Sequence, residues 1–387
     1  MEPLEDLRRR QSAKWRTFAP DVLPLPVAEM DFGLAPAVQH VLREAVERSD
    51  TGYPMAVPAL GVALSAFAER RWGLRLDPQA VAPVPDVGVG VVELLRVLTR
   101  PGDRVVISPP VYPPFFSWVA EAGRQLVEAP LRHGPEGWRL DLAALERAFA
   151  AGAAVYVLCN PQNPVGRVHE ADELRGVVEL AVRYDVIVVS DEVHGPLVLP
   201  GANFTPLLSV PGAGPVAVAV TAASKAWNLA ALKCAAIVTT SDDMATAVAR
   251  LPSDLGWRVG HFGVLASVAA LTEGVAWLDQ LLLTLDRRRT QLGQLLAERL
   301  PAVRWQPPEA TYLAWLDCTR FGDGDAPRDL FLDKGRVALE PGLRFGREGS
   351  GHVRLNFATS AGLLEEAVTR MAVVAAPPSG RAADPRP

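Results

Sequence analysis

The sequence predicts an α/β fold in which a mainly parallel, seven-stranded sheet forms a large domain, accompanied by a smaller α+β domain. Between residues 81 and 238, short runs rich in β-branched residues alternate with helical stretches, which is typical of a parallel sheet covered by helices on both faces. The chain of 387 residues is also too long for one simple core. We therefore expect two domains.

The chain begins with a charged stretch and an extended arm. Prolines near the end of residues 1–34 forbid a helix there and favour an arm that lies across a larger body. The spacing of apolar residues then predicts a helix over 36–48, with proline at its start. A second helix is predicted over 58–72.

The large sheet is predicted from short apolar runs that are bounded by turn residues. These runs are 81–84, 104–108, 125–128, 154–158, 186–190, 216–221 and 234–239. The leucine and valine spacing over 264–300 predicts a long helical region that bridges the two domains. The smaller layer is predicted to contain strands 303–317, 337–340 and 352–356 and helices 328–334 and 361–375.

These elements divide the chain into four segments. We expect an arm and helix (1–48) that pack with the small domain, a large domain (49–275) and a small C-terminal domain (276–375). The tail, 376–387, is polar and rich in proline, so we expect it to be disordered.

The composition excludes several classes of protein. Apolar residues make up 49% and charged residues 21%, and the formal charge is −5 without a basic patch, so no nucleic-acid partner is expected. No apolar leader and no run of about 18 uncharged apolar residues occurs, which predicts a cytoplasmic protein without a membrane partner. Three cysteines lie far apart without a CxxC pair, so we expect no disulfide framework and no metal site.

Lys225 is the first candidate for chemistry. It follows the apolar run 215–221, where a strand should give way to a loop. An amine beside apolar surroundings can have a lowered pKa and become a nucleophile, which suits Schiff-base chemistry. Most lysines, however, are solvated surface residues, so Lys225 alone is a weak signal.

Three further motifs support Lys225. Asp191 comes just past the predicted strand 186–190, where ligands of open α/β sheets bind and a carboxylate could hold a pyridinium proton; alone, a helix cap or loop residue is the simpler interpretation. The segment 159–166 (CNPQNPVG) is a stiff polar loop whose amides can donate to a phenolate oxygen. The segment 85–90 (PDVGVG) opens a helix whose first N–H groups can bind phosphate.

In this order, the asparagine loop, the strand-end aspartate and the lysine resemble the fold type I pyridoxal 5′-phosphate (PLP) enzymes of the class I/II aminotransferase superfamily. The resemblance covers nearly all of residues 10–375 and implies a PLP-dependent transferase-like fold. Within the superfamily, the chain is similar to the cystathionine β-lyase branch of MalY/PatB-type C–S lyases. The segments similar to that branch are 27–32 (VAEMDF), 109–116 (PPVYPPFF), 224–228 (SKAWN), 310–317 (ATYLAWLD) and 351–356 (GHVRLN).

The resemblance implies a role for each matching residue around the cofactor ring. Lys225 would bind PLP as a Schiff base and then move the substrate's Cα proton. Asp191 would keep the pyridine nitrogen protonated. Asn163 would hydrogen-bond the 3′-oxygen, with His194 near the same oxygen, and Tyr112 would stack on the ring.

The same resemblance implies contacts to the cofactor's phosphate. The N–H groups of Val87 and Gly88 would bind it, helped by Ser224 and Lys233. Tyr53 would reach the phosphate of the other subunit's cofactor, which implies a homodimer with shared active sites.

For the small-molecule amino-acid substrate, the resemblance implies a bidentate pair between Arg354 and the α-carboxylate. Asn163, Tyr53 and Ala28 complete the implied substrate-binding set.

Two positions depart from the superfamily pattern. Ala222 stands where many members carry a phosphate-binding serine, so one phosphate contact is missing or comes from Thr221. The stretch 255–262 also differs from the lyase branch. Trp257 or Arg258 therefore either reshapes the side-chain pocket or belongs to a surface loop without substrate contact.

The sequence thus favours a PLP-dependent β-eliminating C–S lyase that converts cystathionine or another S-substituted L-cysteine to thiol, pyruvate and ammonia. An aminotransferase is the main alternative, because transamination uses the same residues. A third is a regulatory protein that binds another protein and retains PLP as structure. The S-substituent does not follow from the sequence.

Overall fold

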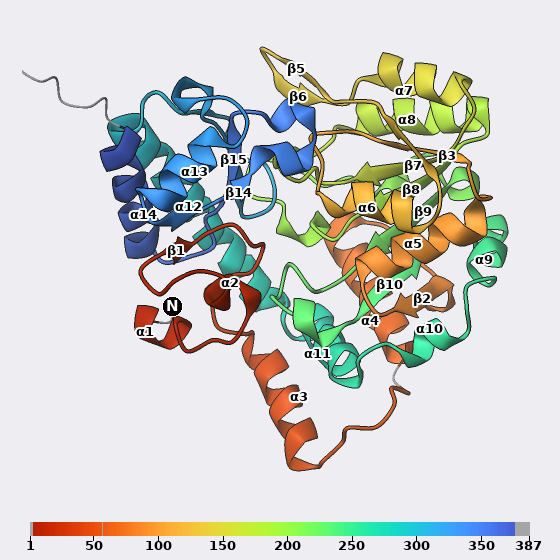
Figure 1. Cartoon of the computed structure of the whole chain (residues 1–387). Coiled ribbons are helices and arrows are strands. Elements are labelled where there is room, and N and C mark those ends of the chain that lie inside the picture. Colours follow the sequence, from red (N-terminus) through yellow and green to blue (C-terminus); the bar gives the residue numbers. More distant parts are fainter. Residues whose placement is uncertain (1–2, 56, 376–387) are drawn as a thin grey trace, which may run out of the picture. The chain divides into compact units, whose positions relative to one another are not determined.

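The computed structural model describes residues 3–55 and 57–375 and divides into two compact units. The first contains the N-terminal arm up to Gly33, then Leu285–Pro308 and the chain from Tyr312 onward, whereas the second contains Leu34–Thr284 and Glu309–Thr311. The tail predicted to be disordered, 376–387, lies outside the described residues. Figure 1 labels the elements of both units.

The second unit contains the predicted large sheet. Its seven strands follow the order β2-β10-β9-β8-β7-β3-β4, and all neighbours are parallel except β10, which is antiparallel to both of its partners. The strands are β2 (Val81–Val84), β3 (Arg104–Ile107), β4 (Gln125–Glu128), β7 (Ala153–Cys159), β8 (Ile187–Asp191), β9 (Ala217–Thr221) and β10 (Ala235–Val238). The predicted mainly parallel sheet of seven strands is therefore confirmed.

Side chains that alternate along β7 pack on opposite faces of the sheet. Val155 and Val157 belong to the core formed with α5 (Val87–Leu98) and α6 (Pro114–Glu121). The Tyr156 ring lies 5.9 Å from that of Phe149 in α7 (Leu142–Ala150), which packs on α8 (Ala171–Tyr184). Because both faces are covered, the central strands are apolar throughout rather than alternating. These helices and the sheet are visible in Figure 1.

Other helices complete the second unit. The predicted first two helices are α3 (Pro36–Glu47) and α4 (Val57–Trp72), and both pack on α11 (His261–Thr272). The sequence groups the helix predicted over 36–48 with the small domain, but α3 lies in the second unit. The predicted domain limits otherwise remain a proposal. The short helices of this unit are α9 (Asp242–Val248) and α10 (Asp254–Trp257).

The helical region predicted over 264–300 is two helices, α11 and α12 (Val275–Arg299), which meet at 77°. The break falls at Gly274, where an added Cβ would lie 2.6 Å from the Ala270 carbonyl oxygen. Among the described residues no single helix is long and apolar enough to cross a membrane; only this bent pair passes that test together. α12 runs from the second unit into the first.

The first unit holds a four-stranded sheet in the order β11-β12-β15-β14 and a parallel pair, β1 with β13. Its elements are α1 (Leu4–Leu7), α2 (Ala13–Arg16), β1 (Leu23–Pro24), β11 (Arg304–Trp305), β12 (Leu313–Asp317), α13 (Ala326–Asp333), β13 (Val337–Ala338), β14 (Glu340–Pro341), β15 (His352–Asn356) and α14 (Ala361–Ala375). Through β1, the arm is hydrogen-bonded to the C-terminal part of the chain.

Two strand predictions in this unit are wrong. The predicted strand 303–317 is split into β11 and β12, because Pro307 and Pro308 cannot donate to a ladder and because Glu309–Thr311 belong to the second unit. The predicted strand 337–340 is also two short strands with different partners, β13 with β1 and β14 with β15.

Candidate active site

Three predicted residues lie at the carboxyl ends of adjacent parallel strands. Asp191 ends β8, the loop that carries Asn163 follows β7, and Lys225 lies in the turn after β9. The register pairs Cys159 with Asp191 and Asp191 with Val220. Because parallel strands place their carboxyl ends on one edge of the sheet, the structure brings these polar groups together where ligands of such sheets bind.

The buried side chain of Trp227 fixes the turn that carries Lys225 to the core of the second unit. This indole is fully buried, and its Nε1–H donates to the Gly274 carbonyl oxygen (3.1 Å). Backbone bonds from Trp227 N to Ala223 O (3.0 Å) and from Leu229 N to Ser224 O (2.9 Å) close the turn. Lys225 itself is half-buried, so its amine stands on a rigid support beside the strand ends.

Asp191 is a buried carboxylate whose charge is disfavoured. Burial raises its pKa to about 7, while the Val193 N–H, which donates to Oδ1 (3.1 Å), and the charge of Lys225 lower the pKa. A buried anion is stabilised by a cationic partner. Asp191 therefore fits a protonated ring nitrogen, and this observation supports a pyridinium ligand.

The Asn163 loop is tied to the neighbouring strand ends. The Gln162 side chain donates to the carbonyl oxygens of Ser108 (3.1 Å) and Pro110 (2.9 Å), which follow β3. Asn163 is 3% exposed, and its backbone N–H donates to Cys159 Sγ (3.4 Å). Asn163 thus lies in a closed, buried loop that follows β7, the strand whose last residue, Cys159, pairs with Asp191.

The start of α5 forms a cradle with positive character. Asp86 caps the helix by accepting from Val89 N (2.8 Å), and its other oxygen pairs with Lys233 Nζ (2.9 Å). The first N–H groups of a helix have no partner within it and carry partial positive charge. The structure therefore brings the predicted Val87, Gly88 and Lys233 to one place, suited to an anion.

Tyr112 is linked to this helix start through Trp118. The rings of Tyr112 and Trp118 meet edge to face at 6.1 Å. A Cβ added to Gly88 would lie 2.8 Å from Trp118 Nε1, so the indole lies against the first turn of α5. Trp118 was not predicted as a site residue, because nothing in its local sequence separates it from a core aromatic.

The remaining predicted residues of the second unit differ in exposure. His194 is buried, whereas Tyr53 is 76% exposed and its ring meets Trp257 edge to face at 5.9 Å. Arg258 pairs with Asp254 (2.5 Å) on the surface of α10. The Thr221 hydroxyl, an alternative phosphate contact, donates to the Glu192 carbonyl oxygen (3.4 Å).

In the first unit, Arg354 and Ala28 lie in one hydrogen-bonded group. Arg354, on β15, is 3% exposed and donates to the Pro26 carbonyl oxygen (2.8 Å). Asn356 and Tyr312 hold the same segment, the latter by donating from its hydroxyl to the Ala28 carbonyl oxygen (3.1 Å). The arm is thus hydrogen-bonded to β15, the strand that carries Arg354, the residue predicted to bind the substrate's carboxylate.

Comparisons with known proteins agree with this geometry. Residues 20–371 match the family described as aminotransferase class I and II. The chain is 48% identical to a putative cystathionine beta-lyase of Mycobacterium leprae, over 95% of this chain and 96% of that protein. It is 36% identical to the cystathionine beta-lyase of Corynebacterium glutamicum, over 96% and 98%. A solved structure, the putative PLP-dependent beta-cystathionase of Corynebacterium diphtheriae, superposes with a TM-score of 0.91 at 36% identity, over 96% and 98%.

Proposed function

The chain belongs to the class I and II aminotransferase family and, within it, to the cystathionine β-lyases, and from this premise we propose that it is a PLP-dependent C–S lyase. It would convert cystathionine or another S-substituted L-cysteine to a thiol, pyruvate and ammonia. The observation that carries the proposal is Asp191, a buried carboxylate with a raised pKa beside Lys225 at the sheet edge.

The residues at the strand ends fit the ring of PLP. Lys225 would bind the cofactor covalently, and Asp191 would pair with its ring nitrogen. Asn163 and His194 would hold the 3′-oxygen, and Tyr112 would pack on the ring. When bound, PLP supplies an electron sink that makes the substrate's Cα proton removable.

The phosphate would lie at the start of α5. Val87 and Gly88 would donate backbone N–H groups, and Lys233 and Ser224 would complete the site. The ion pair between Lys233 and the capping Asp86 supports this placement. It holds the ammonium of Lys233 beside the positive end of α5, where a phosphate would be attracted by both.

We expect Gly88→Ala to raise the dissociation constant for PLP about tenfold. The new methyl would lie 2.8 Å from Trp118 Nε1. This indole is buried against the rings of Phe115 and Tyr112, so we expect the helix start to be displaced. Fluorescence titration of the cofactor-free protein measures the change. Gly362→Ala is the matched control, since a Cβ there meets nothing within 4 Å; equal affinities in the two variants would contradict the phosphate assignment.

The chain's own residues would then perform elimination. Arg354 would bind the substrate's α-carboxylate through its planar guanidinium. Lys225, as a free amine, would take the proton from Cα. The bond between Cβ and sulfur breaks, sulfur leaves as a thiolate that takes up a proton, and the 2-aminoacrylate released reacts with water to give pyruvate and ammonia.

An aminotransferase would use the same residues up to removal of the Cα proton. The names of the relatives support the lyase. A panel of S-substituted L-cysteines tests the proposal, with L-alanine as the matched substrate that lacks a leaving group. We expect pyruvate and thiol from the conjugates and neither product from L-alanine. Failure of every conjugate, together with amino transfer from L-alanine, would favour the aminotransferase.

We further propose a homodimer whose active sites each include Tyr53 from the other subunit. The side chains of Tyr53, Met55 and Trp257 are 76%, 80% and 56% exposed, which makes a cluster of large apolar groups on the second unit. Exposed groups of this kind mark interaction surfaces.

Mixed dimers test this arrangement. Tyr53→Ala and Lys225→Ala proteins are each expected to be nearly inactive, whereas a mixture refolded or exchanged together should recover up to about a quarter of wild-type activity. Random pairing gives half mixed dimers, each with one intact site. Activity that stays at the level of the separate variants, or a fully active monomer on sedimentation, would overturn the proposal.

A further inference from the structure

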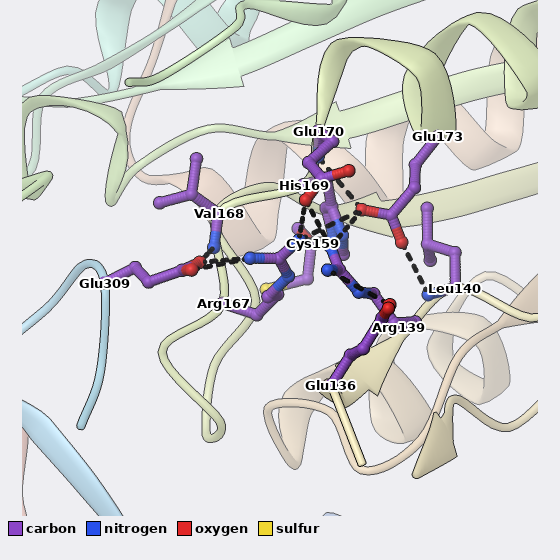
Figure 2. Close-up of polar contacts among 10 residues, drawn as sticks. All are labelled: Glu136, Arg139, Leu140, Cys159, Arg167, Val168, His169, Glu170, Glu173 and Glu309. Carbon is purple, nitrogen blue, oxygen red and sulfur yellow. Dashed lines mark hydrogen bonds and ion pairs between the residues drawn. The ribbon is translucent and has the colours of Figure 1, made fainter. Parts of the chain in front are cut away.

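A cluster of charged side chains surrounds the base of the Asn163 loop. Figure 2 shows Arg167 between Glu309 on one side and Glu170 and Glu173 on the other. Its Nη1 contacts both carboxylate oxygens of Glu309 (2.6 and 2.7 Å), while Nη2 contacts Glu170 (2.9 Å) and Glu173 (3.5 Å). The two ends of one guanidinium therefore connect α8 with a segment 142 residues away, which the single nitrogen of lysine could not do.

Arg167 also closes the loop that carries Asn163. Gln162 N donates to the Arg167 carbonyl oxygen (2.8 Å), and Gly166 N donates to the Gln162 carbonyl oxygen (2.8 Å). Asn163 lies inside this closure, between the two residues of the bridge. Displacement of Arg167 would therefore open the loop at its base.

Two residues of the segment Glu309–Thr311 bond to the end of the Asn163 loop, at Gly166, Arg167 and Val168. The backbone N–H groups of Glu309 and Ala310 both donate to the Gly166 carbonyl oxygen (2.8 and 3.0 Å). Val168 N donates to Glu309 Oε2 (2.9 Å), beside the ion pair with Arg167. Glu309 is thus the residue that contacts this side of the loop with both its side chain and its backbone.

The other edge of the segment contacts the turn after His194. Leu199 N donates to the Glu309 carbonyl oxygen, and Thr311 N donates to the Leu197 carbonyl oxygen (both 2.9 Å). Leu197 N in turn donates to the His194 carbonyl oxygen (2.8 Å). The segment therefore lies between two loops, one that follows β7 and one that follows β8, and joins them.

Backbone strain accompanies this arrangement. Thr311 has φ of +73°, a conformation that a β-branched residue rarely adopts. Such strain persists where the surroundings hold the residue firmly, and it is concentrated at functional sites. The bonds on both edges of the segment provide that restraint.

We propose that Glu309 is a positioning residue, which through Arg167 and its own backbone holds the loops of Asn163 and His194 in a fixed relation. The inference rests on the proposed function in that these two side chains would hold the cofactor's 3′-oxygen. Glu309 itself would not contact the cofactor. Its role would be to keep Asn163 and His194 at a fixed distance and orientation, which binding of one oxygen by two side chains requires.

The test compares Glu309→Gln and Arg167→Lys with Arg183→Gln in the full-length protein. Glu309→Gln removes the charge and keeps the backbone bonds. Arg167→Lys keeps the charge and removes the fork. Arg183→Gln removes an exposed ion pair of the same helix α8, with Glu146, and is the matched control.

The first readout is hydrogen exchange of the cofactor-free protein. Both variants are expected to exchange about tenfold faster in peptides that cover 160–168 and 195–199, with 171–184 unchanged, since local opening leaves the rest of the fold intact. Wild-type rates in both peptides, or acceleration that is equal over the whole chain, would overturn the proposal.

The second readout is the pH at which the absorption of bound PLP changes. Glu309→Gln is expected to move this midpoint in the same direction as Asn163→Ala, whereas Arg183→Gln leaves it at the wild-type value. A midpoint moved by Asn163→Ala but not by Glu309→Gln would contradict the positioning role. If the wild-type protein binds no PLP, the proposed function fails, and hydrogen exchange alone still decides whether Glu309 joins the loops.

Discussion

Lys225→Ala is expected to lose turnover by about 10⁴-fold or more, because one amine provides both the covalent attachment and the base that moves the Cα proton. The protein should also lose the lysine adduct that borohydride reduction makes permanent. Both effects follow from the position of Lys225 in the turn after β9, beside the buried Asp191. Steady-state kinetics and peptide mass spectrometry after reduction measure them.

Lys233→Ala is the matched control for this variant. Lys233 pairs with Asp86 at the start of α5, so its removal should weaken cofactor binding but keep the reducible adduct on Lys225. An adduct found on a different lysine in the Lys225→Ala protein, together with wild-type turnover, would refute the assignment.

Asp191→Asn is expected to lower activity by about 10³-fold and yet to stabilise the cofactor-free protein at pH 8. Burial raises the pKa of Asp191 from 3.8 to about 7. Below pH 3.8 this carboxyl is neutral in both the folded and the unfolded protein. As the pH rises toward 7, the unfolded state gives up its proton first, and the folded state is destabilised.

The size of this effect follows from linkage. Each unit of pKa shift corresponds to about 1.4 kcal/mol, so ionised Asp191 lowers the free energy of unfolding above pH 7 by an amount on the order of 4 kcal/mol. Asparagine removes this dependence. Urea unfolding of both cofactor-free proteins at pH 5 and pH 8 should show a larger gain for the variant at pH 8.

Glu192→Gln is the control for Asp191→Asn, because it removes a neighbouring buried carboxylate that is not proposed to contact the cofactor. Burial also raises the pKa of Glu192 to about 7, but its carboxylate accepts from Ser190 Oγ (3.0 Å) and Leu207 N (2.8 Å). We expect this variant to keep most of its affinity for PLP, whereas Asp191→Asn loses it. Equal loss in both would show that the effect is general to buried carboxylates.

The large sheet could be predicted from the sequence because most of its strands are short apolar runs bounded by turn residues. The order of Asn163, Asp191 and Lys225 then placed three candidates at adjacent strand ends, since parallel strands end on one edge. The strand predicted over 303–317 was wrong because Pro307 and Pro308 interrupt it. The bonds of Glu309–Thr311 to loops within the second unit join residues far apart in the chain, which leave no local signal in the sequence.

Contacts between distant parts of the chain had no local signal. Asp86 matches a helix cap by position, but its pairing with Lys233 joins residues 147 apart, and the Arg167–Glu309 pair joins residues 142 apart. An arginine or glutamate in such a segment looks like any solvated surface residue. The charged cluster around Arg167 therefore emerged only from the folded structure.

The most direct test of the lyase is the stoichiometry of L-cystathionine cleavage. Purified protein is incubated with L-cystathionine, and pyruvate, ammonia and thiol are followed over time with and without 2-oxoglutarate. We expect the three products in equal amounts, at the same rate in both reactions, because a thiolate leaves from Cβ without any amino acceptor. Turnover that requires 2-oxoglutarate, consumes it and releases no thiol would contradict the central claim.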